Sequence, residues 1–393
     1  MPRKISAHYI FPGNANPLKL GIVVIDDDGM ILDLIDTSGK LPETEKLEFF
    51  NGIITPGFIN AHTHLELSHL KGRIKPHTGL SGFIKAIGQL RNDDISEKSL
   101  LDADRLMREN GTVAAGDISN SALSFPIKCK SKIKYHTFIE IFGFQDKIAR
   151  EKMELGITLF EKLKDYSLEG SITPHAPYSM SESLWQMISD YDTEKGLIWS
   201  VHNQESDEEN QLFRDKTGEI ATFLSLIAHE FADWQAKGMT SLQYCRKFYE
   251  NISKTLLIHN TFTSSSDLAC IANLKDKIVL VLCPNANLYI ENQLPDIRSI
   301  STSGFVIALG TDSLASNTTL SILSEMKTIQ QYFPEIKLQN LIDWATINGA
   351  MALGFESIIG TIQKGKKPGL NLITDVNFHK MQLTSQSEVK VLV

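Results

Sequence analysis

The tripeptide His62-Thr63-His64 follows an apolar segment, residues 55–61, that is typical of a β-strand. Side chains two residues apart on a strand point to the same side, so both imidazole rings can reach one metal ion. On a helix of about 3.6 residues per turn, the same spacing would place the two rings roughly 200° apart. A histidine pair also occurs by chance, so this pair alone is weak evidence for a metal site.

Further side chains that can bind a metal or move a proton stand where strand-like segments end; they are His175, His202, His259 and Asp312. Divalent ions such as zinc bind neutral imidazole and carboxylate ligands, and a catalytic site keeps one position open for water. Bound to such an ion, water has its pKa lowered from about 15.7 to about 7, which makes hydroxide available at neutral pH. Three nitrogens and one oxygen for this purpose would come from His62, His64, His202 and Asp312.

Proton transfer needs a group that is not a metal ligand, and the chain offers two candidates. Glu205 stands three residues after His202, where a strand gives way to a helix, and His259 ends the next strand. Each residue also has an ordinary structural explanation. A histidine at a strand end can hydrogen-bond a loop, Asp312 can cap the following helix, and Glu205 can complement a helix dipole. Their joint occurrence at successive strand ends favours the catalytic interpretation.

Apolar strand-like segments alternate with amphipathic helical segments after Pro56. The predicted strands are 57–62, 112–117, 133–141, 170–174, 197–202, 255–259, 277–282 and 305–311. The predicted helices are 79–91, 97–110, 147–165, 181–190, 206–230, 240–251, 264–274, 318–331 and 337–353. This alternation predicts an α/β fold, the (β/α)8 TIM-type barrel, whose catalytic residues lie at the carboxyl ends of its strands. A doubly wound open sheet is the alternative, but no Gly-x-Gly-x-x-Gly motif follows any strand.

Both ends of the chain have a β-like pattern. Residues 22–35 form a predicted hairpin around the turn Asp27-Asp28-Gly29, and β-like segments return at 370–373 and 389–393. The two ends could therefore pair in one small sheet beside the barrel.

The segment between the fifth and sixth strands, residues 205–254, is unusually long and rich in aromatic residues. Extra length at the active-site end of a barrel often forms a lid or a pocket wall. An ordinary helix core explains the aromatic residues equally well, and the sequence leaves both interpretations open.

The composition argues against several other classes of protein. A chain of 393 residues with 42% hydrophobic and 22% charged residues is ordinary for a globular enzyme. A net charge of −8, without a cluster of Lys and Arg, argues against nucleic acid as a partner. No apolar stretch approaches the roughly 18 residues of a membrane span, the N-terminus lacks the apolar core of a signal peptide, and no two cysteines form a Cys-x-x-Cys pair. We therefore expect a cytoplasmic protein with free thiols.

The motifs resemble those of the amidohydrolase superfamily, in particular its branch of cytosine deaminases, S-adenosylhomocysteine deaminases and triazine hydrolases. The resemblance spans nearly the whole chain. It rests on Pro56-Gly57-Phe58-Ile59-Asn60-Ala61-His62-Thr63-His64, His175-Ala176-Pro177-Tyr178-Ser179, His202-x-x-Glu205-Ser206 and Leu309-Gly310-Thr311-Asp312-Ser313-Leu314-Ala315-Ser316-Asn317. It implies a (β/α)8 barrel over residues 56–358, flanked by a small β-sandwich that is formed by both termini, residues 1–55 and 359–393.

Carried over residue by residue, the resemblance implies one divalent metal ion, with zinc as the first expectation and iron as the second. The implied metal ligands are His62, His64, His202 and Asp312. The implied catalytic residues are Glu205, His259 and Asp312, and His175 would contact the substrate. No residue matches the bridging carboxylated lysine of the binuclear branches, which stands where this chain has His175.

The reaction that the resemblance implies is hydrolytic deamination of an amino-substituted heteroaromatic ring, with release of ammonia. The segment His62-Thr63-His64-Leu65-Glu66-Leu67-Ser68 resembles that of aminofutalosine deaminases more than that of S-adenosylhomocysteine deaminases, so an adenine nucleoside derivative such as aminofutalosine is the lead substrate. The same metal hydroxide could instead hydrolyse a cyclic amide or a C–Cl bond on a heterocycle, whereas an inactive barrel scaffold would need a missing ligand. We expect a small heterocyclic substrate, no nucleic acid or membrane partner, and a homodimer as the assembly to test.

Overall fold

The structure is a computed structural model that describes residues 2–90, 93, 95–193 and 195–393. The last residue of the helix predicted at 79–91 lies outside the described residues. Among the described residues, no helix has the length and apolar character needed to cross a membrane.

Eight parallel strands form two four-stranded sheets, in the orders β6-β7-β8-β9 and β10-β11-β12-β13. Their bounds are β6 Phe58–Thr63, β7 Thr112–Ser119, β8 Lys134–Ile141, β9 Glu169–Pro174, β10 Ile198–Asn203, β11 Lys254–His259, β12 Ile278–Leu282 and β13 Val306–Leu309. Each strand coincides with a predicted one, within two residues at either end. Parallel strands that are buried on both faces are nearly continuous apolar runs, which is why the sequence predicts them well.

Hydrogen bonds between strand ends connect the two sheets. Between β9 and β10, the amide of Ser200 donates to Oγ1 of Thr173 at 2.7 Å. Between β13 and β6, the amide of Thr311 donates to the carbonyl oxygen of His62 at 3.0 Å. The strands therefore follow one another in chain order, with the first beside the last, as in TIM-type folds. This arrangement brings the carboxyl ends of β6, β10 and β13 together.

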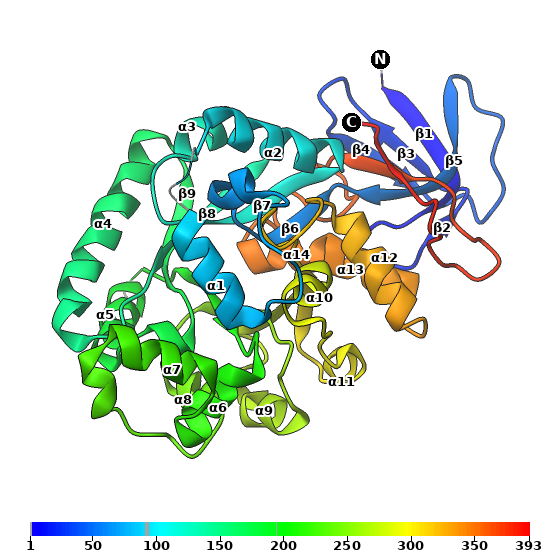
Figure 1. Ribbon diagram of the computed structural model, residues 1–393. Coiled ribbons are helices and arrows are strands. Elements are labelled where there is room, and N and C mark those ends of the chain that lie inside the picture. The colour runs from blue at the N-terminus through cyan, green and yellow to red at the C-terminus, as the bar shows by residue number, and fades with distance from the viewer. Residues whose placement is uncertain (1, 91–92, 94, 194) are drawn as a thin grey trace.

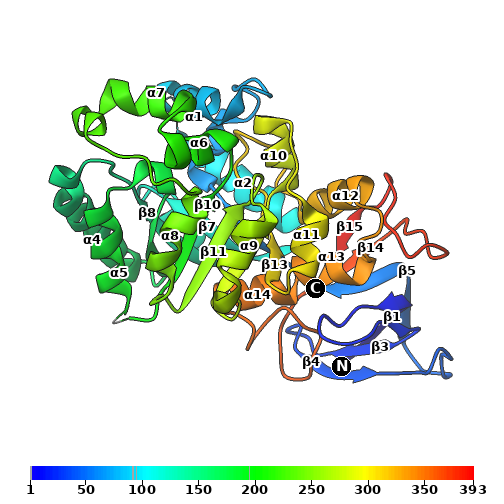
Figure 2. The same ribbon diagram turned by 90° about the horizontal axis from the view of Figure 1, so that it is seen from below.

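Helices cover the outside of the parallel strands (Figures 1 and 2). The longer ones are α1 Gly79–Leu90, α2 Glu97–Glu109, α4 Ala149–Asp165, α5 Glu182–Thr193, α6 Asp207–Asp215, α7 Gly218–Ile227, α8 Ser241–Tyr249, α10 Pro284–Glu291, α12 Ile322–Tyr332, α13 Leu338–Ala345 and α14 Ile347–Leu353. The shorter ones are α3 Phe125–Lys128, α9 Ser265–Cys270 and α11 Ile297–Thr302, and the 3-10 helix η1 spans Leu65–Leu70.

Several helical predictions differ from the structure. The helix predicted at 206–230 is broken into α6 and α7 because Lys216 takes a left-handed φ of 58° and ends the first helix. The helix predicted at 337–353 is likewise interrupted at Thr346. The sequence did not predict α10, because it is short and its asparagines are poor helix formers.

Both chain ends build one mixed seven-stranded sheet in the order β15-β14-β5-β1-β3-β4, with β2 paired to β1. The bounds are β1 Arg3–Ile10, β2 Leu18–Lys19, β3 Ile22–Ile25, β4 Ile31–Ile35, β5 Leu47–Pro56, β14 Leu370–Ile373 and β15 Val389–Val391. Figure 1 shows this sheet at one side of the molecule, with both termini on it. The predicted pairing of the two ends is confirmed. The second layer of a sandwich stays a prediction.

Apolar side chains fix the strands from both sides. Apolar residues that include Ala61, Phe138 and Ile258 pack together around the parallel strands, and they are fully buried. Trp185 of α5 and Trp199 of β10 pack in the larger cluster between the strands and the outer helices. The polar residues at the strand ends therefore stand on a close-packed base.

Candidate active site

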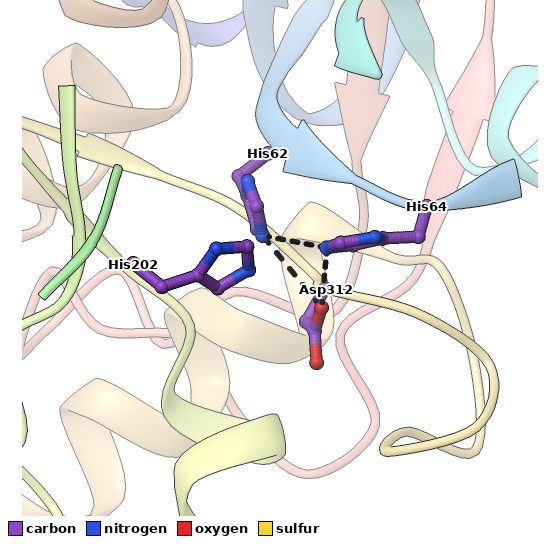
Figure 3. Close-up of side chains that lie close together, drawn as sticks. All are labelled: His62, His64, His202 and Asp312. Atoms are coloured by element: carbon purple, nitrogen blue, oxygen red, sulfur yellow. Dashed lines mark hydrogen bonds and ion pairs between the residues drawn. The ribbon is translucent and has the colours of Figure 1, made fainter. Parts of the chain in front are cut away.

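Three imidazole rings and one carboxyl group converge where β6, β10 and β13 end (Figure 3). The Nε2 atoms of His62 and His64 are 3.1 Å apart, and they lie 3.6 and 3.3 Å from Oδ1 of Asp312. His202 adds the third ring, and the candidate ligand atoms of the four residues all lie within 4.8 Å of one another. The structure thus places the four sequence-predicted ligands in one small volume.

The backbone holds Asp312 in an uncommon conformation that aims its carboxyl group at the histidines. Asp312 has a φ of 55°, which L-residues rarely adopt. Its amide donates to the carbonyl oxygen of His62 at 3.1 Å, and the hydroxyl of Thr63 donates to its carbonyl oxygen at 3.0 Å. The helix-cap explanation of Asp312 is wrong, because the N-cap of α12 is Ser321.

The surroundings of the four candidate ligands keep the three imidazole rings neutral and the carboxyl group of Asp312 ionised. Burial lowers the pKa of His62, lowers that of His64 to about 4, and lowers that of His202 well below its ordinary value. Burial opposes ionisation of Asp312, but hydrogen bonding and charge from His62 and His64 outweigh it and depress the pKa of its carboxyl group.

The tautomer of His202 also suits a metal ligand. Its Nδ1 lies 3.2 Å from the carbonyl oxygen of His175, which can only accept a hydrogen bond, so we assign the proton to Nδ1. Nε2 then carries the lone pair. Together with two further imidazoles and one carboxylate, this is a set of ligands that fits a divalent ion such as zinc.

Glu205 and His259 lie together beside the four candidate ligands. Oε1 of Glu205 is 3.4 Å from Nε2 of His259, and both side chains are buried. Burial, followed by the charge of Asp312, raises the pKa of Glu205 well above its ordinary value. Burial lowers the pKa of His259, although Asp312 and Asn287 oppose the shift. Glu205 lies before Ser206, the N-cap of α6, and is therefore outside the first turn, whose carboxyl groups are those of Asp207, Glu208 and Glu209.

His175 occupies the wall of the same cavity, which measures about 360 Å³. Its Nδ1 lies 2.8 Å from Oγ of Ser179. The cavity is also lined by His64, Glu140, His202, Glu205, His259 and Asp312. All seven sequence-predicted site residues therefore meet in one region, because Nε2 of His62 lies 3.1 Å from Nε2 of His64, which lines the cavity.

Helices α1 and α7 lie side by side (Figures 1 and 2) and supply apolar side chains to the cavity wall. Phe83, Ile84 and Ile87 come from α1, and Phe223 and Ile227 come from α7. The long segment at 205–254 thus forms part of the pocket wall.

Three residues of the site were missed by reasoning from the sequence. Oδ1 of Asn287, on α10, lies 2.8 Å from Nδ1 of His259 and fixes the tautomer of that ring. The hydroxyl of Ser316 donates to Oδ2 of Asp312. Glu140 is the residue before the last of β8 and lines the cavity. A search for polar residues at every strand end would have found Glu140, whereas Asn287 carries no sequence signal, since only the fold brings it to His259.

Comparison with known proteins agrees with this geometry. Residues 53–392 match the family described as "Amidohydrolase family", so the chain belongs to that family. It is a hydrolase that acts on carbon–nitrogen bonds, as the sequence predicted.

Several curated relatives are deaminases. An adenosine deaminase of Helicobacter pylori is 25% identical over 89% of this chain and 87% of its own length. An aminodeoxyfutalosine deaminase of Nitratiruptor is 26% identical over 82% of this chain and 79% of its own length.

Solved structures show the same fold. The crystal structure of Helicobacter pylori aminofutalosine deaminase in complex with methylthio-coformycin has a TM-score of 0.81 and 24% identity, and it covers 96% of this chain and 94% of that one. A triazine hydrolase variant has a TM-score of 0.74 at 14% identity, covering 99% and 93%.

Proposed function

We propose that this protein hydrolytically deaminates the adenine ring of a nucleoside derivative, with an aminofutalosine-like compound as the lead substrate. The observation that carries the proposal is the convergence of His62, His64, His202 and Asp312 beside the proton-transfer pair Glu205 and His259. The deaminase names of the relatives in Helicobacter pylori and Nitratiruptor support the reaction class.

We propose that one zinc ion is held by the four convergent residues, with iron as the alternative. Neutral imidazoles and one carboxylate suit either metal, and the pKa directions favour those protonation states. A divalent ion held there supplies a water whose pKa has fallen to about 7.

The residues around that position would divide the proton transfers. Glu205 would take a proton from the attacking water and deliver it to the ring nitrogen beside the carbon that carries the amine. His259 holds its proton on Nδ1 toward Asn287, so its Nε2 can accept a hydrogen bond on the side of Glu205. The carboxylate of Asp312 would accept the second proton from the attacking oxygen and pass it to the amine, which then leaves as ammonia, while Ser316 donates a hydrogen bond to its other oxygen. His175, in the cavity wall, would contact the substrate.

Substrate loss and ammonia release, both measured across a panel of compounds, test the reaction. The panel contains aminopurine nucleosides, aminopyrimidines, cyclic amides and chlorinated triazines, because the same site could attack any of these. We expect the fastest ammonia release with an adenine nucleoside. Faster cleavage of a cyclic amide or a C–Cl bond would contradict the proposal.

We also propose three parts for the chain: residues 1–55 and 359–393 as a β-sandwich, and 56–358 as a closed (β/α)8 barrel. The mixed sheet of both termini and the chain-order arrangement of the eight strands support this division. A stable fragment 56–358 that kept activity after limited proteolysis of the ends would support it further.

A cytoplasmic homodimer that binds neither nucleic acid nor membranes is our proposal for the assembly. The four free cysteines fit a reducing compartment, and the net charge of −8 disfavours nucleic acid. Light scattering of the purified protein measures the oligomeric state, and a monomer would contradict the dimer.

A further inference from the structure

Glu140 places a carboxyl group in the wall of the active-site cavity that the proposed reaction does not use. It stands near the carboxyl end of β8, where side chains alternate in direction. Its neighbours Ile139 and Ile141 pack into the cluster between the strands and the outer helices, so Glu140 faces the cavity. Its side chain is only 5% exposed.

The two carboxyl oxygens of Glu140 have different surroundings. Oε2 accepts a hydrogen bond from the side-chain amide of Asn120 at 3.0 Å. Oε1 is buried and has no hydrogen-bond partner among the described residues. Nδ1 of His202 lies 3.6 Å from it, beyond hydrogen-bonding distance, and that nitrogen is already oriented to the carbonyl oxygen of His175. A ring nitrogen of His175 also lies within 4.8 Å of the Glu140 carboxyl group.

A buried carboxyl oxygen without a donor is costly, and its place in a substrate cavity indicates that a ligand supplies the donor. Glu140 lies on the Nδ1 side of His202, whereas the candidate metal position lies on the Nε2 side. The substrate group that donates a hydrogen bond to Oε1 of Glu140 therefore lies near the reacting carbon but is not attached to it. In a nucleoside, the groups that stand one ring away from the base are the ribose hydroxyls.

We propose that Glu140, held by Asn120, accepts hydrogen bonds from the vicinal hydroxyls of the substrate ribose. This inference rests on the proposed function, since only a nucleoside carries that sugar. Carboxyl groups suit a diol because two oxygens can accept from two adjacent donors, and acidic residues recognise ribose hydroxyls in other folds. Glu140 would then select ribonucleosides over 2′-deoxyribonucleosides.

The test compares two ribonucleosides with their 2′-deoxy analogues: adenosine with 2′-deoxyadenosine, and 5′-deoxyadenosine with 2′,5′-dideoxyadenosine. The comparison uses the pair whose ribonucleoside releases ammonia faster than the ribonucleoside of the other pair. We expect kcat/KM of the wild type to favour the ribonucleoside by about tenfold to a hundredfold, the usual effect of one buried hydrogen bond to a carboxylate.

The variant Glu140→Gln should lower kcat/KM for the ribonucleoside by a similar factor. For the 2′-deoxy analogue, kcat/KM should stay within about threefold of the wild-type value, with metal content unchanged. Glu169→Gln is the matched control, because Glu169 is exposed at the opposite end of β9 and pairs with Lys134. It should leave all rates within about twofold.

Three results would overturn the proposal. Equal wild-type rates for a ribonucleoside and its 2′-deoxy analogue would do so without any variant. An equal loss on both substrates in Glu140→Gln, accompanied by loss of metal, would show that Glu140 supports His202 instead. Ammonia release from no adenine nucleoside would overturn the proposed function itself, and the ribose subsite with it.

Discussion

At the scale of single residues, the site shifts the pKa values of two buried carboxyl groups in opposite directions. The pKa of Asp312 is depressed by neighbouring histidines, whereas burial raises that of Glu205 well above its ordinary value. Two carboxyl groups with separated pKa values are a common arrangement for dividing an anionic role from a proton-transfer role. The division here follows from position, since Asp312 faces two imidazoles and Glu205 faces one.

The variant Glu205→Gln tests the proton-transfer role apart from the metal. Glutamine has nearly the same shape but cannot accept a proton, so metal content should stay at the wild-type level. We expect turnover to fall by about 10²–10⁴-fold, the usual contribution of a general acid–base group. The measurement is kcat for ammonia release at saturating substrate. Turnover within about threefold of the wild type would contradict the role.

Asp312→Asn tests whether this carboxylate only binds the metal. Asparagine keeps a carbonyl oxygen but loses the negative charge and the capacity to take a proton. We expect weaker metal binding and, at saturating metal, a remaining loss in kcat of about a hundredfold. Wild-type kcat at full metal occupancy would reduce Asp312 to a ligand alone.

At the scale of elements, a buried ion pair supports the turn that follows the histidine pair. Lys128 of α3 pairs with Oδ2 of Asp117 on β7, and both side chains are fully buried. Oδ1 of Asp117 accepts the backbone amide of Leu65 at 2.7 Å, directly after His64. The pair thus ties β7 to the start of η1.

The variant Asp117→Asn should destabilise the protein by about 3–5 kcal/mol, because Lys128 would remain buried without its counter-charge. Urea denaturation measures the loss. A double variant Asp117→Asn with Lys128→Met removes the orphan charge and should recover much of that stability. A loss below about 1 kcal/mol in the single variant would show that the pair is dispensable.

A second contact between two elements makes the stability of the folded protein depend on pH. Asp192 of α5 accepts the indole N–H of Trp199 on β10, and burial raises the pKa of Asp192 to about 7. The folded state therefore binds this proton more tightly than the unfolded state, whose pKa is about 3.9. Stability from this group is present below about pH 4 and is lost as the pH rises through 7.

We expect Asp192→Asn to remove that part of the pH dependence, which amounts to about 2–4 kcal/mol between pH 4 and pH 8. The variant should gain stability relative to the wild type as the pH rises. Urea midpoints of both proteins at pH 5 and pH 8 provide the comparison, and parallel changes would rule out Asp192 as the titrating group.

At the scale of the whole molecule, the sequence was sufficient for the strands and for the residues at their ends. Most of the eight buried strands are largely apolar, and the candidate ligands stand in the last residues of β6 and β10 or shortly after β6 and β13. Contacts that depend on tertiary structure could not be read this way. Asn287 reaches His259 only because α10 packs against the strand ends, and the break between α6 and α7 depends on a left-handed residue, Lys216, that is neither glycine nor asparagine.

Metal removal tests the central claim most directly. The wild-type protein is stripped with a chelator, its metal is counted by elemental analysis, and ammonia release from an adenine nucleoside is measured before and after zinc is returned. We predict one metal ion per chain, loss of at least about a hundredfold in rate on stripping, and recovery at one equivalent of zinc. Full deaminase activity in metal-free protein would contradict the account.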